Sequence, residues 1–481
     1  MNWILIIDIV YITLILLVCL RIIYDTNSVL KTLAYLLVVI FIPIIGVIFY
    51  FSFGINYRKR KMYSKKLVRD NKLRKEIETR IHIRTQENLI QYAGVISDSK
   101  GLVNLLVNDN WSPLTGGNQA RLLINGEETF PDLLSVLKEA KHHIHIQYYI
   151  FENDVIGNKI KNLLIEKAKQ GVKVRFIYDD FGSSSIRGKV VNEIKVAGVE
   201  AYPFNRIHLL FLANRLNYRN HRRIVVVDGR TAFTGGVNVS DRYINTGTNQ
   251  LYWRDTHLRI DGTGCHYLQY LFFCDWNFAS GQQIEPDTTY FHGIHHAHAD
   301  VAVQIAASGP DSPTATIMLS FLKAITSAKE SILITTPYFI PGESILDALK
   351  VASLSGVSVS ILVPGVSDSW WVNMAARSFY TELLKVGVKI YLYQKGFLHA
   401  KTMVIDNNLS IIGTANMDYR SFDLNFELSV LLFDFDMAKK LKSIFHEDLS
   451  NSKKINPELW HQRKLHKKLS ERIARLLSPL M

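Results

Sequence analysis

The sequence predicts an α/β protein made of two related halves, which follow two apolar N-terminal segments. One motif occurs twice, as NHRRIVVVDGRTAFTGGVN at 220–238 and as LHAKTMVIDNNLSIIGTAN at 398–416. Both copies fit H-x-[K/R]-x4-D-x6-G-x2-N without a change in spacing. From about residue 118 onward, apolar β-branched runs alternate with helix-like segments, as expected of α/β layers. Together these observations predict a duplicated domain with one composite active site.

The elements are expected in the same order in both halves. In the first half three strand-like runs lead into the motif: HHIHIQYYIF (142–151), GVKVRFIYDD (171–180) and GVEAYPFN (198–205). In the second half the corresponding runs are ESILITTPYFI (330–340), GVSVSILVPG (356–365) and GVKIYLYQ (387–394). Matching glycines end the intervening helices in both halves. We expect the first half at 116–290 and the second at 291–450.

Two apolar runs, 3–23 and 33–53, precede the halves. Each is about 20 residues, the length that a helix needs to cross ~30 Å of hydrocarbon. A cleaved signal peptide is the alternative for the first run, but no charged segment precedes it and no small-residue cleavage site follows. We therefore expect two transmembrane helices within 1–56.

A dense basic run, NYRKRKMYSKKLVRDNKLRKE (56–76), directly follows the second apolar run and opens a basic linker at 57–115. Such runs stay on the cytoplasmic side of a membrane. The excess of 56 Lys and Arg over 43 Asp and Glu suits an anionic partner, either nucleic acid or an acidic membrane surface. The adjacent spans favour anionic membrane lipids and argue against nucleic acid. We expect a multi-pass protein of the cell membrane with its catalytic part in the cytoplasm.

The end of the chain, 451–481, has apolar residues at helical spacing and a basic face, which predicts an amphipathic helix. This helix either lies on the membrane surface or packs on the domain.

Cysteine and histidine usage predicts neither disulfides nor a metal site. Cys19, Cys265 and Cys274 are scattered and form no CxxC pair, which fits a reducing compartment. The histidine-rich stretch FHGIHHAHAD (291–300) holds no cysteine and has a single carboxylate nearby. It is interpreted as a loop between the halves.

Each motif copy predicts a β-hairpin. On a strand, residues two apart face the same side, so His221 shares a face with Arg223 and His399 shares one with Lys401. Two-residue turns at 229–230 and 407–408 would place each histidine opposite an asparagine, Asn238 or Asn416.

The acidic and small residues of the motif have structural explanations. Asp228 and Asp406 fall at the turn, where aspartate bonds the local backbone, so we expect their role to be chiefly structural. Gly235, Gly236 and Gly413 would leave room for a ligand to approach the backbone.

An imidazole, a cation and an amide side by side suit a phosphodiester. The cation and amide bind the non-bridging oxygens, and histidine serves as a nucleophile or an acid near neutral pH. Two facing copies supply one histidine for each role. A nucleophilic imidazole needs an acceptor for its second nitrogen. Asp255 and Glu427, acidic residues within strand-like apolar segments, are the candidates for orienting the two histidines.

The two motif copies resemble those of the phospholipase D superfamily, and the whole chain resembles the bacterial cardiolipin synthases within it. The resemblance also covers TGGN (115–118), IHIQYYIF (144–151), ASGPD (307–311), TPYFIP (336–341) and ERIARLLSPL (471–480). It implies two phospholipase D-like α/β/α sandwich halves related by a pseudo-twofold axis, after two transmembrane helices. The implied reaction moves a phosphatidyl group between two phosphatidylglycerol molecules through a phosphohistidine, giving cardiolipin and glycerol without a metal or other cofactor.

The resemblance also implies the residue roles. The nucleophile is assigned to His221, and the acid and base to His399. The implied catalytic set is the six residues of the two H-x-[K/R]-x4-D cores: His221, Arg223, Asp228, His399, Lys401 and Asp406. Asn238, Asn416, Asp255 and Glu427 are the residues expected to bind phosphate or orient the histidines.

One residue departs from the family pattern, which has lysine where this chain has Arg223. A guanidinium stays charged and binds phosphate in a bidentate manner, but it is larger than an ammonium. Two other functions fit the same residues. One is a membrane-anchored hydrolase, either a phospholipase D or a nuclease, that uses water as acceptor. The other is an inactive scaffold, which the intact histidines, Lys401 and asparagines argue against.

Overall fold

The computed structural model describes residues 3–26, 29–51, 71–205, 218–246, 251–285, 287–292, 300–476 and 478. Most of the basic run at 56–76 lies outside these residues, as do His295, His296 and His298 of the expected inter-half loop. The three cysteines, all within the described residues, form no disulfide.

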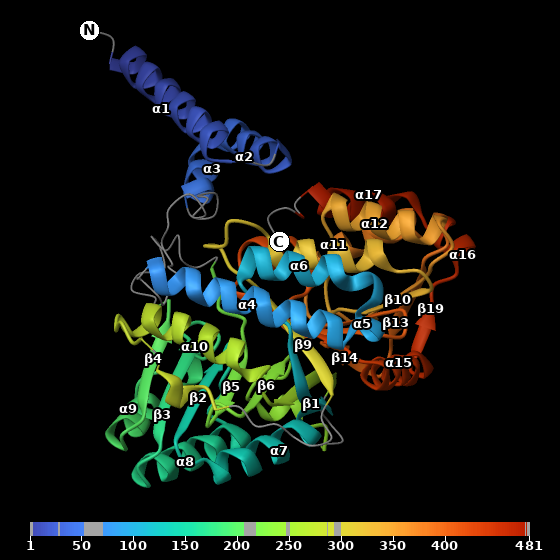
Figure 1. Ribbon diagram of the computed structural model, residues 1–481. Coiled ribbons are helices and arrows are strands. Elements are labelled where there is room, and N and C mark those ends of the chain that lie inside the picture. The colour runs from blue at the N-terminus through green and yellow to red at the C-terminus, as the bar shows by residue number, and fades with distance from the viewer. Residues whose placement is uncertain are drawn as a thin grey trace.

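One 15-stranded sheet runs through both halves of the protein (Figure 1). The first half supplies β1 (Thr115–Ile124), β2 (His143–Tyr148), β3 (Lys173–Asp179), β4 (Glu200–Phe204), β5 (Ile224–Val227), β6 (Thr231–Gly235) and β8 (Thr256–Asp261). The second half supplies β9 (Val301–Ser308), β10 (Ser331–Thr335), β12 (Ser358–Pro364), β13 (Lys389–Tyr393), β15 (Thr402–Ile405), β16 (Leu409–Gly413), β18 (Glu427–Phe433) and β19 (Ser452–Lys454).

The two halves join where β1 pairs antiparallel with β9, with Asn118 opposite Val301. Moving outward from this pair, one side reads β1-β8-β6-β5-β2-β3-β4 and the other reads β9-β18-β16-β15-β10-β12-β13. These are the same elements in the same order, with β2-β3-β4 and β10-β12-β13 parallel. The repeated element order predicted from the sequence is therefore present in the sheet.

Helices cover both faces of this sheet. The outer helices of the first half are α7 (Asn125–Glu139), α8 (Val155–Lys169) and α9 (Lys189–Val196), and those of the second are α11 (Thr316–Ser327), α12 (Glu343–Leu354) and α13 (Trp370–Lys385). The last helix of each half, α10 (Cys265–Ser280) or α15 (Phe435–Ser450), lies on the opposite face and shares one apolar core with strands of both halves. Alternation along β5 sends Val225 and Val227 to the outer core and Ile224 and Val226 to the shared core.

Between the apolar segments and the halves lie α4 (Asn71–Gln91), α5 (Ala93–Ile96) and α6 (Lys100–Asn110). Leu102, Val103 and Leu106 of α6 join the outer core of the second half. This stretch of the linker therefore packs on the second half.

The apolar N-terminus differs from the expectation of two long helices. The first run forms α1 (Trp3–Asp25), in which Leu5–Asp25 is long and apolar enough to cross a membrane. The second run is broken into α2 (Val29–Phe41) and α3 (Pro43–Phe49). Pro43 lacks an N–H group and disfavours helical geometry at the residue before it, and Ile42 accordingly leaves that geometry. Of the described helices, only α1 is both long enough and apolar enough to cross a membrane.

The C-terminal segment is also divided. Ser452–Lys454 adds β19 to the edge of the sheet beside β13, and the chain continues as α16 (Pro457–His461) and α17 (Leu465–Leu476). The expected amphipathic helix is thus confined to α17.

Candidate active site

The two motif copies meet at their histidine ends. There the chain just before each hairpin pairs with the backbone of the other half. Asn220, one residue before His221, forms a parallel bridge with Phe426, and the His221 N–H donates to the Phe426 carbonyl at 2.9 Å. In the same way, Leu398 of β14 (Gly396–Leu398) pairs with Arg254 of β7 (Tyr252–Arg254), and the His399 N–H donates to the Arg254 carbonyl at 2.7 Å. Each histidine is therefore fixed by backbone bonds to the opposite half.

His399 is held by a carboxylate of the first half. Its Nδ1 lies 2.6 Å from Oδ2 of the fully buried Asp255. Burial, together with the charge of Lys401, lowers the pKa of His399 to about 4, although Asp255 acts in the other direction. The rings of Trp253 and Phe397 lie beside this imidazole, with centroids 5.7 Å and 5.9 Å away. His399 is thus a neutral, desolvated imidazole at neutral pH.

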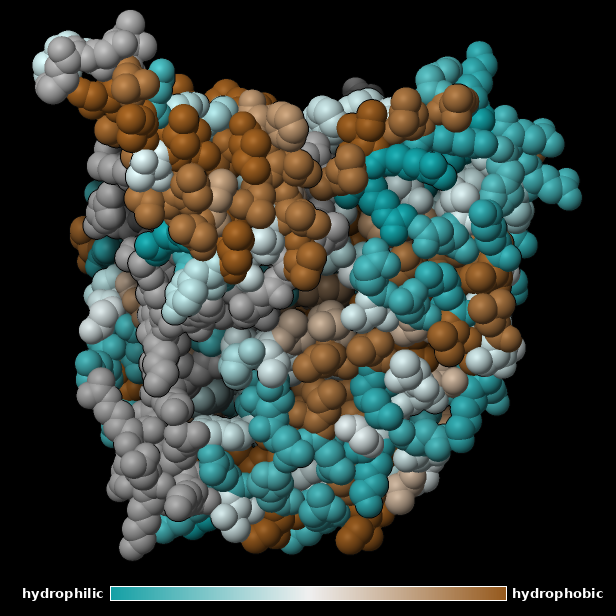
Figure 2. Space-filling model, turned by 90° about the horizontal axis from the view of Figure 1, so that it is seen from above, coloured by the Kyte–Doolittle hydropathy of each residue, from teal (hydrophilic) through white to brown (hydrophobic). Residues whose placement is uncertain are grey.

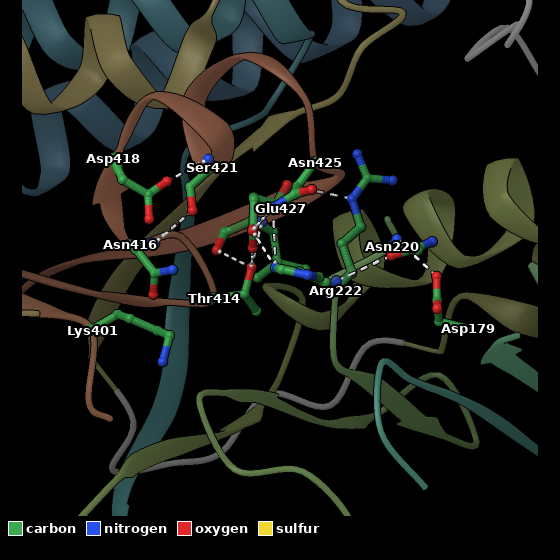
Figure 3. Close-up of polar contacts among 12 residues, drawn as sticks. Asp179, Asn220, Arg222, Lys401, Thr414, Asn416, Asp418, Ser421, Asn425 and Glu427 are labelled. Atoms are coloured by element: carbon green, nitrogen blue, oxygen red, sulfur yellow. Dashed lines mark hydrogen bonds and ion pairs between the residues drawn. The ribbon is translucent and has the colours of Figure 1, made fainter. Parts of the chain in front are cut away.

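His221 is held by a carboxylate of the second half. Its Nδ1 lies 2.9 Å from Oε1 of the fully buried Glu427 and 3.2 Å from Nδ2 of Asn425. The Thr414 hydroxyl donates to the other oxygen of Glu427. The Tyr149 ring covers the imidazole at 4.2 Å between centroids. Figure 3 shows Glu427 between Thr414 and Asn425, with Lys401 on one side and Asn220 on the other.

The two acidic residues identified from the sequence are therefore placed beside the two histidines, and they are exchanged between halves. Asp255 follows β7 in the first half and serves His399, while Glu427 begins β18 in the second half and serves His221. Burial opposes ionisation of Asp255, but the charges of His399 and Lys401 outweigh it and lower the pKa of Asp255. In both imidazoles Nδ1 consequently contacts a carboxylate, and Nε2 does not.

Arg223 and Lys401 are both buried within the site. Arg223 donates from Nη1 to the His221 carbonyl at 2.6 Å, and the Lys401 amine donates to the His399 carbonyl. Burial, together with the nearby charge of Arg223, lowers the pKa of Lys401 to about 7, although Asp255 raises it. Two cations held this close favour the binding of an anion between them.

The two asparagines differ in their contacts. Asn238 accepts from Arg223 Nε at 3.0 Å and donates to the Tyr243 hydroxyl at 2.7 Å, so both ends of its amide are bonded within the protein. Asn416 is also buried, but its Oδ1 has no hydrogen-bond partner in the described part of the chain. Asn238 is therefore placed to orient Arg223, whereas Asn416 retains an unpartnered amide oxygen.

Asp228 and Asp406 lie away from the histidines, at the other end of each hairpin. Asp228 accepts three backbone N–H groups at the start of β2, from residues 141–143, at 2.8–2.9 Å. Asp406 accepts the equivalent three at the start of β10, from residues 329–331. Both carboxylates are therefore bonded to the backbone, the structural role that their position in the turn predicted.

The hairpin register is one residue away from the expected one. Val227 pairs with Thr231 and Ile405 with Leu409, so each loop has three residues instead of two. The extra residue is the aspartate, whose φ of 53° in Asp228 and 51° in Asp406 is left-handed. Aspartate tolerates this geometry, and here its side chain is held by the three backbone bonds.

The motif glycines also serve a different purpose from the expected one. A Cβ on Gly236 would meet Asp255 Oδ1 at 1.9 Å, and one on Gly413 would meet the Leu428 carbonyl at 2.4 Å. The absence of a side chain therefore lets neighbouring strands and the carboxylate approach, instead of admitting a ligand.

Two buried ion pairs support the crossing strands and were not identified from the sequence. Arg222 donates from Nη1 to Asp275 of α10 at 2.8 Å and from Nη2 to the Ser308 carbonyl of β9 at 3.2 Å. Arg254 forms a bidentate pair with Asp448 of α15 at 2.9 Å. Arg222 lies between two motif positions, and this adjacency is the one sequence signal that could have drawn attention to it.

No group of three or more His, Cys, Asp or Glu side chains in the described residues is arranged to hold a metal ion. The site's donor set is two imidazoles, two cations and amides, and it suits an anionic substrate better than a cation.

The comparisons with known proteins agree with this geometry. A family model described as the phospholipase D-like domain of cardiolipin synthase matches residues 133–253 and 321–449, one segment in each half. A model described as the N-terminal segment of phospholipase D-nuclease matches residues 2–54. A cardiolipin synthase of Alkalihalophilus pseudofirmus is 42% identical over 451 residues, covering 94% of this chain and 89% of that protein. The chain belongs to the cardiolipin synthase family of phospholipase D-like proteins.

Further cardiolipin synthases show similar identity. The major cardiolipin synthase ClsA of Bacillus subtilis is 41% identical and covers 93% of each chain. One from a Geobacillus species is 43% identical over 94% of this chain. Membership of this family makes the protein a phosphatidyltransferase of the phospholipase D type.

A solved structure supports the fold alone. Phosphatidylserine synthase of Haemophilus influenzae aligns with a TM-score of 0.58 at 13% identity, covering 79% of this chain and 100% of that one. The α/β fold with phospholipase D-like domains is thus confirmed.

Proposed function

We propose that this cardiolipin synthase transfers a phosphatidyl group from one phosphatidylglycerol to another, and that His221, His399, Arg223 and Lys401 carry the chemistry. The observation that carries the assignment is the pair of histidines, each with Nδ1 against a fully buried carboxylate of the other half. This arrangement leaves two Nε2 atoms for one phosphodiester. The relatives at 41–43% identity, which are named cardiolipin synthases, supply the substrate class.

In the first step Nε2 of His221 attacks the phosphorus of phosphatidylglycerol. A P–N bond forms as the P–O bond to glycerol breaks, and His399 gives its proton to the departing glycerol oxygen. Glu427 accepts the Nδ1–H of His221 and stabilises the positive charge that develops on the ring.

In the second step His399 removes the proton from a hydroxyl of a second phosphatidylglycerol. That oxygen attacks the phosphorus, the P–N bond breaks, and the products are cardiolipin and a free His221. The same group thus serves as acid and then as base, as reversibility requires.

The low pKa of His399 bears on its role as acid. Without substrate the pKa is about 4, so His399 is neutral at pH 7. A phosphodiester anion beside it favours the imidazolium and raises the pKa, which couples proton uptake to substrate binding. Lys401, with a pKa of about 7, gains a full charge by the same mechanism.

We also propose roles for the amides and the charges. Arg223 and Lys401 bind the non-bridging oxygens and stabilise the transition state. Asn238 holds the Arg223 guanidinium, and Asn416 contacts the substrate or its headgroup. Arg223, which stands where the family pattern has lysine, donates to Asn238, and this fixed guanidinium supports an active first copy.

The finer membrane arrangement belongs to the proposal as well. We propose that α1 crosses the membrane, that α2 and α3 complete a second, broken span, and that both catalytic halves lie in the cytoplasm. The basic run at 56–76 supports this orientation. The two halves are proposed to be related by a pseudo-twofold axis at the β1–β9 pair, which the repeated strand order supports.

The test is incubation of the full chain in vesicles with phosphatidylglycerol carrying a labelled headgroup glycerol and a labelled acyl chain. Equal release of labelled glycerol and formation of cardiolipin are expected. Phosphatidic acid in place of cardiolipin would show a hydrolase, and no turnover would show an inactive scaffold. Either result overturns the proposal.

A further inference from the structure

The C-terminal helix α17 packs on the second half with a glutamate and an alanine instead of with its large apolar residues. Glu471 and Ala474 are the buried residues of this helix. Glu471 accepts from Arg377 of α13 at 3.1 Å and from Nη2 of Arg463 at 3.0 Å. A carboxylate held between two arginines therefore forms the centre of this contact.

The apolar side chains of α17 face outward. Leu465, Leu469, Ile473 and Leu476 are 81%, 56%, 51% and 72% exposed. Their spacing of four, four and three residues places them on one face of a helix. That face lies opposite Glu471 and Ala474, because at about 100° per residue the two sets differ by about half a turn. A helix in water would normally present these two faces the other way round.

The basic residues of α17 are also divided between the inner and the outer side of the helix. Arg475 turns inward, where it pairs with Glu382 and Glu343. Lys467 and Arg472 are exposed, and Lys468 lies on the same edge of the apolar face as Arg472. The outward surface thus combines an apolar stripe with a basic edge, which is the pattern of a helix lying in a membrane interface.

The neighbour of α17 is the apolar N-terminus. An open cavity of about 870 Å³ is lined by Leu33 and Leu37 of α2 on one side and by Arg472 and Leu476 of α17 on the other. Figure 1 shows α17 on the same upper side of the body as α1–α3, and Figure 2 shows apolar residues gathered over part of that face. The C-terminal end of the stripe, at Leu476, therefore lies across this cavity from α2, the helix that follows α1.

We propose that α17 is a second membrane contact, which inserts its apolar stripe among the lipids of the bilayer that holds α1 and sets its basic edge against anionic phosphates. A second copy of the chain is the less suitable occupant, because pairing two such stripes would bring Lys468 and Arg472 close to their counterparts. The contact is independent of the transfer chemistry. It holds the second half against the surface that supplies the substrate.

Fluorescence from two positions on α17 tests this contact in the full chain. Cys19 is first replaced by serine, since Cys265 and Cys274 are buried. Leu469→Cys is then labelled with an environment-sensitive nitrobenzoxadiazole, and Lys467→Cys is the matched control on another side of the same helix. Both proteins are reconstituted into phosphatidylcholine vesicles with or without phosphatidylglycerol.

The label at 469 is expected to be quenched several-fold more by nitroxide lipids, and less by iodide, than the label at 467. The difference should grow when phosphatidylglycerol is present. Equal quenching at the two positions overturns the proposal. Protection from iodide without quenching by nitroxide lipids also overturns it, because the stripe is then covered by protein.

A functional measurement accompanies the labels. Leu469→Asp with Ile473→Asp should lower transfer severalfold on vesicles while leaving transfer in detergent micelles unchanged. Val196→Asp on α9, at a position that is 90% exposed, is the matched control and should change neither. Unchanged vesicle activity in the double variant would contradict the proposed contact. Loss in detergent as well would show a general folding defect, in which case the label experiment decides.

Discussion

The two histidines occupy equivalent places in the two halves but unlike surroundings. His399 lies beside the rings of Trp253 and Phe397, and its Nδ1 is 2.6 Å from Asp255, whose side chain is shorter than that of Glu427. His221 has a polar neighbour instead, because Asn425 occupies the position that matches Trp253. The repeated backbone therefore supplies the geometry, and the residues that differ between copies supply two distinct imidazoles. Such a difference is what a reaction with one nucleophile and one acid requires.

Removal of either histidine has the largest expected effect. His221→Ala and His399→Ala should each lower transfer by about 10³-fold or more, since neither imidazole can replace the other. The measurement is cardiolipin formation from labelled phosphatidylglycerol. Full activity in either variant would refute the composite site.

The same experiment can separate the two roles. After a rapid quench at high pH, the labelled phosphatidyl group should be found on the peptide that contains His221. Label on the His399 peptide would reverse the assignment while leaving the composite site intact.

Removal of a supporting carboxylate should have the next largest effect. Asp255→Asn and Glu427→Gln are each expected to lower transfer by about 10²-fold. Asn425 should not compensate for Glu427→Gln, because its Nδ2 is a donor and cannot accept the Nδ1–H of His221. Asp434→Asn is the control, since asparagine also caps a helix and α15 should remain intact. Equal activity of Asp255→Asn and the control would argue against the exchanged pairing.

Lys401 and Arg223 should affect the pH dependence of transfer differently. Lys401 has a pKa lowered to about 7, so it is charged below that pH and loses its proton above it. The kcat/KM of transfer, which reports the free enzyme, should therefore decline on the alkaline side. Lys401→Arg should extend activity to higher pH, because a guanidinium stays protonated. Conversely, Arg223→Lys should introduce a second alkaline decline. A pH profile that is identical for wild type and Lys401→Arg would contradict this prediction.

The smallest expected effect is on folding stability at low pH, and it should differ between the two halves. Burial lowers the pKa of His143 to about 4 and that of His257 to about 3, and it also lowers the pKa of His145. Ser331, Leu333 and Ser429 occupy the matching places in the second half.

The direction of this effect follows from proton binding. The unfolded chain binds protons near pH 6.5 that the folded chain does not, so folding stability is present above that pH and is lost as the pH falls toward 4. The melting temperature should drop by a few degrees between pH 7 and pH 5. Hydrogen exchange should show the first half opening before the second, and simultaneous opening would count against this prediction.

Much of the site could be predicted because its signals are local. The invariant spacing revealed both histidines and both cations, and a buried acid in an apolar strand is costly enough to identify Asp255 and Glu427 as partners of something charged. The turn position identified Asp228 and Asp406 as structural.

The remaining features depend on contacts between distant segments. The hairpin register shifted by one residue because backbone groups of β2 and β10 hold the two aspartates in a left-handed conformation. The exchange of carboxylates depends on the strands crossing at Phe426 and Arg254, for which no single segment carries a signal. The break at Pro43 had a local cause and was nevertheless missed, since length and hydropathy alone suggested one continuous span.

The exchanged carboxylates have a consequence for how such a chain could arise. A single half holds a histidine and a carboxylate that do not serve one another, so it would be active only after meeting a second copy. Assembly of separate halves would then depend on their concentration in the membrane. Joining them in one polypeptide replaces that dependence with a fixed effective concentration, and it leaves each copy free to acquire its own neighbours around the imidazole.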